Sequence, residues 1–430
     1  MIMKILIKNG HVVDPANKIN RVCDILIRDN KIARVADSIK EDAERIIDAT
    51  AKIVMPGIVD MHVHLREPGR EDKETILSGT RAALKGGVTT VLAMPNTLTS
   101  IDCIENVRLL KNIIANTAQV NVFIAGAITH AREGKELTDI SGLKKEGIIA
   151  ISDDGSSVDS DTLMLEALKT AKKENTLVTC HCEDKMLSCG GVVNLGFTST
   201  RMGLRGVSRE SEYKRIQRDI ELAQKADAPI HIAHASCAES VEIIASAKKK
   251  GLKVTAETAP HYFALDEESV LNYDTNKKMN PPLRSKNDVL AIKQALAEGV
   301  IDAIASDHAP HTENEKEVEF DRAEFGVVGM ETIFSVSVTE LLKTGLLDLN
   351  ELVKKLTSNP AKILRVNKGT LGMGCDADIV IVSLDREWVV DRTNLISKSK
   401  NSAFLGRTLK GLVEYTICGG KVAYTSNDRR

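Results

Sequence analysis

Eight short apolar segments recur through the middle of the chain, and amphipathic helical stretches such as "ETILSGTRAALKGG" and "DTLMLEALKTAKKEN" lie between them. Apolar runs of this length that alternate with helices are typical of buried parallel strands. The number of strands favours an α/β fold of the (β/α)8 TIM-barrel type over an open sheet. The predicted strands are "GIVDMHV", "VTTVLAMP", "VNVFIAGAI", "GIIAIS", "TLVTCH", "PIHIAH", "LKVTAET" and "IDAIASD".

The two ends of the chain have a different sequence pattern. Short, β-branched, alternating segments such as "KILIKNGHVVD" fill the first part, and similar segments return near the other end in "DADIVIVSLD" and "VEYTICGGKVAYT". Turn residues separate them, as in antiparallel sheets. We therefore expect one small β-sandwich domain built from both termini, residues 1–54 and 366–430, beside a metal-dependent hydrolase barrel of residues 55–365.

Polar side chains collect where the predicted barrel strands end. His62 and His64 lie two residues apart on an extended strand, so both imidazoles face the same side. The carboxyl ends of barrel strands meet at one mouth, where catalytic residues gather. We therefore expect a shared polar cavity. The other polar residues at strand ends are Asp153, Asp154, His181, His234, Asp307 and His308.

The alternative to a metal site is a set of unrelated structural histidines. A single histidine at a strand end is more often a hydrogen-bonded structural residue than a ligand. Histidines and carboxylates at five strand ends are costly to bury together unless a cation offsets them, and this favours a metal site. We assign His11, His130 and His231 to structural roles. The role of His261, in "TAPHY", stays open.

The longest predicted loop is Ala309–Gly329, which is charged and has few apolar anchors. Loops of this length in compact domains are usually functional lids or disordered segments. We treat the lid as the hypothesis to test.

Composition excludes several functions. Lys and Arg number 58 and Asp and Glu number 60, so no global field attracts nucleic acid or an anionic membrane. The apolar runs are shorter than the roughly 20 residues of a membrane span. The eight cysteines form no CxxC pair, and no signal peptide precedes them. We expect a soluble protein of the reducing cytoplasm with a small-molecule substrate.

A series of motifs resembles the amidohydrolase superfamily and, within it, the bacterial and archaeal dihydroorotases. The resemblance runs from about residue 5 to residue 420. The motifs appear in the family's order: "DMHVHLREPG", "MPNT", "SDDG", "HCED", "IAHAS", "MNPPLR", "SDHAPHT" and "FGVVGMET".

The resemblance implies two zinc ions per subunit. His62, His64 and Asp307 would bind one, and His181 and His234 the other. Many relatives bridge the metals with a carboxylated lysine, but "GIIAIS" ends without one. In this subtype an aspartate bridges. The spacing to His181 matches Asp154, and Asp153 stays open as the second choice.

The resemblance also implies the reaction. The family cyclises N-carbamoyl-L-aspartate reversibly to L-dihydroorotate with loss of water, the third step of de novo pyrimidine (UMP) biosynthesis. Zinc would activate water for attack on the ring amide, and Asp307 would carry the proton to the departing nitrogen. The substrate site would consist of His64, Arg66, Asn96, Asn280, His311, Phe325 and Gly326.

Two other functions remain as alternatives. A hydantoinase or allantoinase shares the barrel and the HxH pair, but such relatives generally have the strand-end lysine and lack an arginine after the second histidine. A non-catalytic dihydroorotase-like subunit would hold a partner enzyme such as aspartate transcarbamoylase, yet such proteins tend to lose metal ligands. A homo-oligomer or an association with aspartate transcarbamoylase is compatible with either role.

Overall fold

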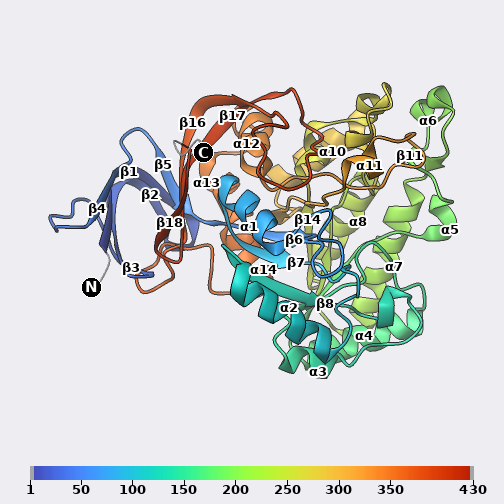
Figure 1. Cartoon of the computed structure of the whole chain (residues 1–430). Helices are drawn as coiled ribbons and strands as arrows, with labels where there is room; N and C mark the ends of the chain where they lie inside the picture. Colours follow the sequence, from blue (N-terminus) through green and yellow to red (C-terminus); the bar gives the residue numbers. More distant parts are fainter. Residues whose placement is uncertain (1–3, 427–430) are drawn as a thin grey trace.

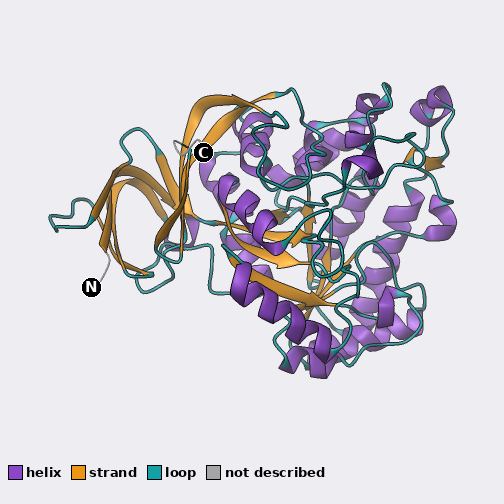
Figure 2. Cartoon of the chain, in the orientation of Figure 1, coloured by secondary structure: helices purple, strands orange, loops and turns teal. Residues whose placement is uncertain are grey.

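The computed structural model describes residues 4–426, and its larger part is a barrel of eight parallel strands surrounded by helices (Figures 1 and 2). The predicted (β/α)8 barrel is confirmed, and each predicted strand is present in chain order. The strands are β6 (Ile58–Val63), β7 (Val88–Ala93), β8 (Asn121–Gly126), β9 (Ala150–Ile151), β10 (Leu177–Cys180), β13 (Ile230–Ile232), β14 (Val254–Thr258) and β15 (Ala303–Ile304).

The first and last barrel strands approach each other just beyond their ends. Val63 forms an isolated parallel bridge with His308, and the His64 N–H donates to the His308 carbonyl at 2.8 Å. The barrel is therefore nearly closed, and its seam lies beside the histidine pair.

Helices cover the outside of the barrel. They begin at residues suited to the N-cap position: Thr75 caps α1, Ser160 caps α4 and Ser285 caps α10. The main helices are α1 (Ile76–Lys85), α2 (Ile104–Thr117), α3 (Ile140–Lys145), α4 (Asp161–Lys173), α7 (Glu210–Ala226), α8 (Ala238–Lys249), α10 (Lys286–Ala297), α12 (Ile333–Ser337), α13 (Leu349–Leu356) and α14 (Ser358–Leu364). Within residues 4–426, no helix is long and apolar enough to cross a membrane.

Short elements interrupt the βα alternation. The excursion between β10 and α7 contains α5 (Lys185–Ser188), β11 (Val193–Asn194), α6 (Phe197–Met202) and β12 (Gly206–Val207), and α9 (Pro260–Ala264) follows β14. Further short helical turns lie at Pro15–Asn17, His130–Arg132, Glu267–Val270, Thr275–Lys277 and Val338–Leu342.

Helix α14 covers the amino-terminal end of the barrel. Ala361 and Leu364 of this helix pack in one apolar cluster with residues such as Val59 and Ala303, which stand at or near the start of their strands. Apolar packing fills this end, so the opposite, carboxyl end is the one available to polar side chains.

The two ends of the chain form one eight-stranded sheet, which confirms the predicted β-domain built from both termini. The sheet is mixed, because two of its strand pairings are parallel where antiparallel pairing was expected. β5 pairs antiparallel with β16, with Ile379 opposite Pro56, and this pairing joins the terminal segments. Buried residues of both segments share a core, among them Ile7, Ile25 and Ile381. The strands are β1 (Lys4–Asp14), β2 (Ile19–Arg28), β3 (Lys31–Ala36), β4 (Arg45–Asp48), β5 (Ile53–Pro56), β16 (Ile379–Val389), β17 (Thr408–Cys418) and β18 (Lys421–Thr425). Residues 1–3 and 427–430 of the predicted terminal domain lie outside the described residues.

The segment 309–329 is more ordered than its composition predicts. It contains the short helix α11 (Glu313–Lys316), and its side chains Lys316 and Phe320 are buried. The Lys316 ammonium donates to the carbonyls of Glu324 and Gly326 at 2.8 and 3.0 Å. The prediction of a loop without regular structure was wrong because a buried lysine supplies the anchoring that apolar residues usually give.

Candidate metal centre and active site

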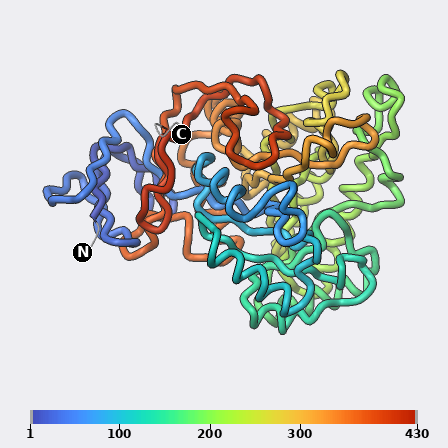
Figure 3. Tube along the Cα trace, in the orientation of Figure 1, coloured from blue at the N-terminus to red at the C-terminus, as the bar shows by residue number. Residues whose placement is uncertain are grey.

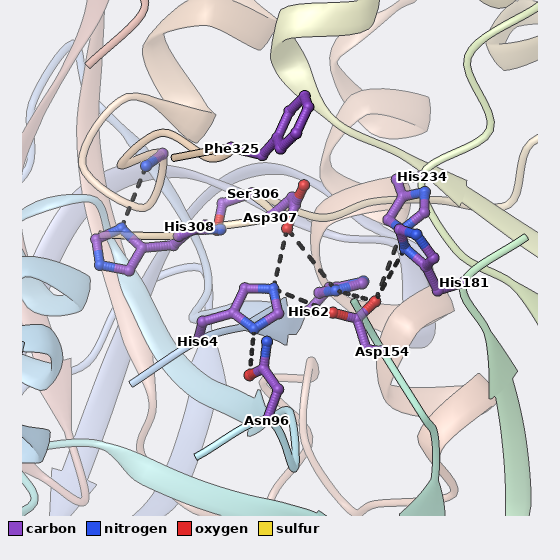
Figure 4. A network of polar contacts seen from close by, with 12 residues as sticks. His62, His64, Asn96, Asp154, His181, His234, Ser306, Asp307, His308 and Phe325 are labelled. Carbon is purple, nitrogen blue, oxygen red and sulfur yellow. Dashed lines mark hydrogen bonds and ion pairs between the residues drawn. The ribbon is translucent and has the colours of Figure 1, made fainter. Parts of the chain in front are cut away.

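The side chains predicted as metal ligands come together at the carboxyl end of the barrel. His62 lies near the end of β6 and His64 just beyond it, while the others follow the ends of β9, β10, β13 and β15 within three residues. Figure 4 shows their side chains facing one central space. The residues are His62, His64, Asp154, His181, His234 and Asp307, and each is buried.

These residues make two candidate metal sites that share Asp154. His62, His64 and Asp154 form one group, and Asp154, His181 and His234 form the other; within each group the candidate ligand atoms lie within 4.8 Å of one another. Asp154 Oδ1 lies 3.3 Å from His62 Nε2, and its Oδ2 lies 3.4 Å from His64 Nε2. The two buried clusters with one common carboxylate therefore indicate a binuclear site.

Asp154 also faces the second group, and Asp307 flanks the first. Asp154 Oδ1 is 3.6 Å from His181 Nδ1 and 3.7 Å from His234 Nε2. Asp307 Oδ1 is 3.2 Å from His64 Nε2 and 3.7 Å from His62 Nε2. Burial disfavours the charged form of Asp307, but the neighbouring His64 and His62 rings outweigh it and lower its pKa below the usual range.

Partners behind the histidines set which ring nitrogen faces the centre. His62 Nδ1 lies 2.8 Å from Glu257 Oε1, and His64 Nδ1 lies 2.8 Å from Asn96 Oδ1. Because these oxygens only accept hydrogen bonds, each Nδ1 carries the proton and each Nε2 presents a lone pair to the central space. This is the arrangement that metal-binding histidines adopt in proteins.

The donor atoms fit bound cations. His62 Nε2 and Asp154 Oδ1 are buried, yet neither has a hydrogen-bond partner among the described residues. Such orphaned polar atoms are costly in a protein interior unless another group satisfies them. Imidazole nitrogens and carboxylate oxygens are the ligand types that zinc and similar divalent ions accept.

The neighbouring Asp153 does not face the candidate metal groups but contacts the loop that follows β8. Its carboxylate accepts hydrogen bonds from the backbone N–H groups of Ile128 and Thr129, at 2.8 and 3.0 Å, and from the Thr129 hydroxyl. These contacts hold Asp153 against the loop that follows β8. Of the two aspartates, only Asp154 belongs to the two candidate metal groups.

Three of the candidate site residues have an unusual backbone. Arg66, His234 and Asp307 have φ values of 64°, 36° and 48°. Residues other than glycine rarely adopt this left-handed region, and such strain tends to be retained at functional sites.

A cavity of about 440 Å³ opens beside the metal-type ligands. His64, Asp154, His181, His234 and Asp307 line one part of it. Four cationic side chains line it as well: Arg66, Arg70, Lys73 and Arg132. A cavity lined by both metal-type ligands and cationic side chains suits an anionic molecule that also contacts a metal.

Arg66 is fixed at the edge of this cavity. Its Nε donates to the Pro310 carbonyl at 3.1 Å, and its Nη2 lies 3.2 Å from His311 Nε2. Burial lowers the pKa of Arg66 to about 10, although Asp307 and Asp154 favour the charged form. The guanidinium therefore remains protonated at neutral pH and places a positive charge opposite the carboxylates.

The other predicted substrate-binding residues line the same cavity: Asn96, Asn280, His311, Phe325 and Gly326. Asn280 Nδ2 donates to Glu183 at 3.0 Å, and His311 Nε2 lies 2.8 Å from the Phe325 carbonyl. Gly326 has a φ of 130°, and a Cβ there would stand 2.7 Å from the Ala309 Cβ. A glycine is therefore required where the segment 309–329 turns over the cavity.

The remaining histidines lie outside the two candidate metal groups. His231 Nδ1 contacts the Thr255 hydroxyl at 2.9 Å, and His11 Nε2 contacts Asn20 at 2.7 Å in the terminal sheet. His130 is half-exposed and 4.0 Å from Asp102. His261 is buried on α9, and burial lowers its pKa to about 4, so this side chain is neutral. His308 Nε2 faces Glu74 at 3.4 Å.

Several residues that contact the candidate site were not among the predicted site residues. Glu257 contacts His62 on one side and His231 Nε2, at 3.4 Å, on the other. A carboxylate inside the apolar strand "LKVTAET" was a usable signal, because it needs a buried partner. Lys73 Nζ contacts His311 Nδ1 at 3.0 Å, and Arg132 donates to the Asp154 carbonyl at 2.8 Å. Lys73 lies in a loop and Arg132 ends a short helical turn, and no sequence pattern identifies either residue.

The barrel and the shared-carboxylate histidine site define a metal-dependent hydrolase of the amidohydrolase class. Two family models match the chain: "Dihydro-orotase-like" over residues 51–240 and "Amidohydrolase family" over residues 277–424. A curated dihydroorotase of Elusimicrobium minutum is 54% identical, covering 98% of this chain and 97% of its own. One of Pelotomaculum thermopropionicum is 49% identical, with 98% coverage of both chains. The chain belongs to the dihydroorotase family.

Solved structures with the same fold carry other names. An L-hydantoinase (dihydropyrimidinase) from Arthrobacter aurescens superposes with a TM-score of 0.89 at 25% identity, covering 98% of this chain and 96% of that one. The fold is thus common to several cyclic-amide hydrolases, and the site distinguishes among them.

Proposed function

We propose that this protein catalyses the reversible cyclisation of N-carbamoyl-L-aspartate to L-dihydroorotate with loss of water, the third step of de novo pyrimidine (UMP) biosynthesis. The observation that carries the proposal is a single cavity lined by metal-type ligands and by Arg66 with Asn96 and His311. Dihydroorotate has both features that such a cavity can bind, a ring amide and a carboxylate.

The carboxylate would lie against Arg66, Asn96 and His311. Arg66 offers a planar charged fork, which suits a carboxylate better than a lysine ammonium does. The contact of Asn96 Oδ1 with His64 turns the amide nitrogen of Asn96 away from that ring. Asn280 and the backbone of Phe325 and Gly326 would contact the amide edge of the ring.

Two zinc ions would occupy the ligand clusters. His62, His64 and Asp307 would hold one ion, His181 and His234 would hold the other, and Asp154 would bridge them. Such ions polarise a carbonyl and lower the pKa of water toward neutrality. His64 would also contact substrate, because it lines the cavity.

Asp307 would move the proton. In the hydrolytic direction its carboxylate would take a proton from the attacking water and pass it to the ring nitrogen, which is otherwise a poor leaving group. In the biosynthetic direction Asp307 would take the proton from the ureido nitrogen and return it to the departing oxygen. Burial of Asp307 keeps bulk water from competing for that proton.

The hydantoinase alternative receives support only from the shared fold. Hydantoin carries no ring carboxylate, so Arg66 and the other cations of the cavity would have no anionic group to bind. A purely scaffolding role is also disfavoured, since all six ligand positions hold ligand-type residues. Neither alternative accounts for both the metal clusters and Arg66.

The experiment is a paired measurement on the purified protein. Zinc per chain is determined, and turnover is assayed on L-dihydroorotate and on hydantoin side by side. We expect about two zinc ions per chain and activity on dihydroorotate. Activity on hydantoin alone would contradict the proposed role of Arg66, and a metal-loaded protein inactive on both would contradict the proposed function.

A further inference from the structure

The segment of residues 390–407 connects β16 to β17 and runs from the terminal sheet over the barrel, as the red trace in Figure 3 shows. It contacts several parts of the cavity rim. Ser399 donates to the Lys73 carbonyl at 2.7 Å, and Arg392 contacts Glu313 of α11 at 3.0 Å. A distant part of the chain thus reaches the segment 309–329, which we call the lid.

Asn401 makes the densest set of these contacts. Its Nδ2 donates to the carbonyls of Gly326 at 3.1 Å and Ala309 at 3.4 Å. Its Oδ1 accepts from the His311 N–H at 3.2 Å, and its own carbonyl accepts from the Val328 N–H at 3.0 Å. Asn401 therefore joins the beginning of the lid to its end.

The side chain of Asn401 is well suited to this junction. The residue is 4% exposed, so each lost hydrogen bond would leave a polar group buried and unsatisfied. An asparagine amide donates and accepts at once, whereas an aspartate carboxylate only accepts. The contacts with Gly326, Ala309 and His311 need both functions in one side chain.

The residues that Asn401 holds line the cavity, although Asn401 itself does not. Ala309, His311 and Gly326 all border the cavity. His311 and Gly326 are also groups that we propose to bind substrate. Lys316 and Lys278 hold the middle of the lid through its backbone carbonyls. The Ala309 N–H donates to the Val327 carbonyl at 2.8 Å, and Asn401 adds the side-chain contacts that hold His311 and Gly326 at this junction.

We propose that Asn401 is a positioning residue that sets the substrate-binding side of the cavity by joining the two ends of the lid. The inference rests on the proposed function, since it assigns the lid residues to substrate. Asn401 acts through His311 and Gly326 and touches neither the metal ligands nor the reacting atoms.

The test uses Asn401→Asp and Asn401→Ala in the full-length, zinc-loaded protein. We expect unchanged zinc content and a KM for L-dihydroorotate raised about 10- to 100-fold, because small misplacements of positioning groups have effects of this size. The fall in kcat should be smaller than the rise in KM, since Asn401 contacts none of the candidate metal ligands.

A second readout needs no substrate. Arg322 lies in the lid with an exposed side chain and is a cleavage point for trypsin. Both variants should be cut at the lid at least several-fold faster than the parent protein. This measurement separates the inference from the proposed function. A parent protein inactive on dihydroorotate would refute the function, while the cleavage rates would still test whether Asn401 holds the two ends of the lid.

The matched control is Asn359→Asp. Asn359 on α14 also donates from Nδ2 to a backbone carbonyl, that of Asp302 at 2.8 Å, but at the opposite end of the barrel. The control should lower the melting temperature without changing KM or lid cleavage. KM and cleavage rates of both Asn401 variants within twofold of the parent, or matching those of the control, would overturn the inference.

Discussion

Glu257 accepts a hydrogen bond from Nδ1 of His62 at 2.8 Å, and this contact directs Nε2 of His62 toward Asp154. Burial acts against a charged Glu257, yet hydrogen bonds with His231 and His62 lower its pKa to about 2. The residue is therefore an anion at neutral pH. A carboxylate behind a ligating histidine fixes the ring and strengthens it as a ligand.

Replacing Glu257 by glutamine should weaken metal binding. Glutamine keeps an acceptor for His62 but removes the charge, so we expect a loss of roughly 10- to 100-fold in affinity for one zinc ion. Competition with a chromophoric chelator measures this directly. Glu414→Gln, in the terminal sheet and remote from the ligands, is the control. Equal zinc affinity in the Glu257 variant and the parent would contradict the role.

The adjacent residues Asp153 and Asp154 should respond differently to replacement by asparagine. Asp154→Asn removes the carboxylate common to both ligand groups, and we expect substoichiometric zinc and loss of turnover. Asp153→Asn should keep its zinc but lose about 1–3 kcal/mol of stability, because its carboxylate accepts three hydrogen bonds that an amide cannot all accept. Metal analysis and thermal unfolding of both variants distinguish the two roles. The reverse pattern would mean that Asp153 is the bridge.

Asp307→Asn tests the proton transfer. We expect turnover to fall about 10² to 10⁴-fold, the range for a lost acid-base group, together with weaker binding of one metal. Assays at saturating zinc remove the second effect. Near-normal turnover under those conditions would show that another group carries the proton.

Arg66→Met should impair substrate binding more than metal binding. A charge-assisted hydrogen bond contributes about 1.5–3 kcal/mol, which corresponds to a KM roughly 10- to 150-fold higher for dihydroorotate. Zinc content should match that of the parent, because Arg66 is no ligand. Arg108→Met, an exposed arginine on α2, serves as the control. An unchanged KM in the Arg66 variant would place the substrate carboxylate elsewhere.

The barrel was predictable because its strands are apolar, regularly spaced and separated by helices. The position of the site followed from the same pattern, since His62, His181 and His234 stand at strand ends. The spacing to His181 favoured Asp154 but did not exclude Asp153. The difference depends on the loop after β8, whose backbone N–H groups bind Asp153.

Contacts between distant loops were beyond sequence reasoning. Lys73 and Asn401 lie far apart in the chain and both hold His311, yet neither belongs to a periodic pattern. Helix α11 is a different case, because Thr312 and Glu315 form a capping box. The signature "TENE" could have predicted a helix start inside the lid.

The pairing of β5 with β16 carries a consequence for how the protein is made. The barrel strands are complete once residue 304 has been synthesised, but Asn401 emerges about a hundred residues later, between two strands that must still join the first sheet. During synthesis, all six candidate metal ligands therefore leave the ribosome before Asn401, which completes the contacts of the lid. The candidate ligand set is thus complete in the chain well before the substrate-binding side of the cavity is.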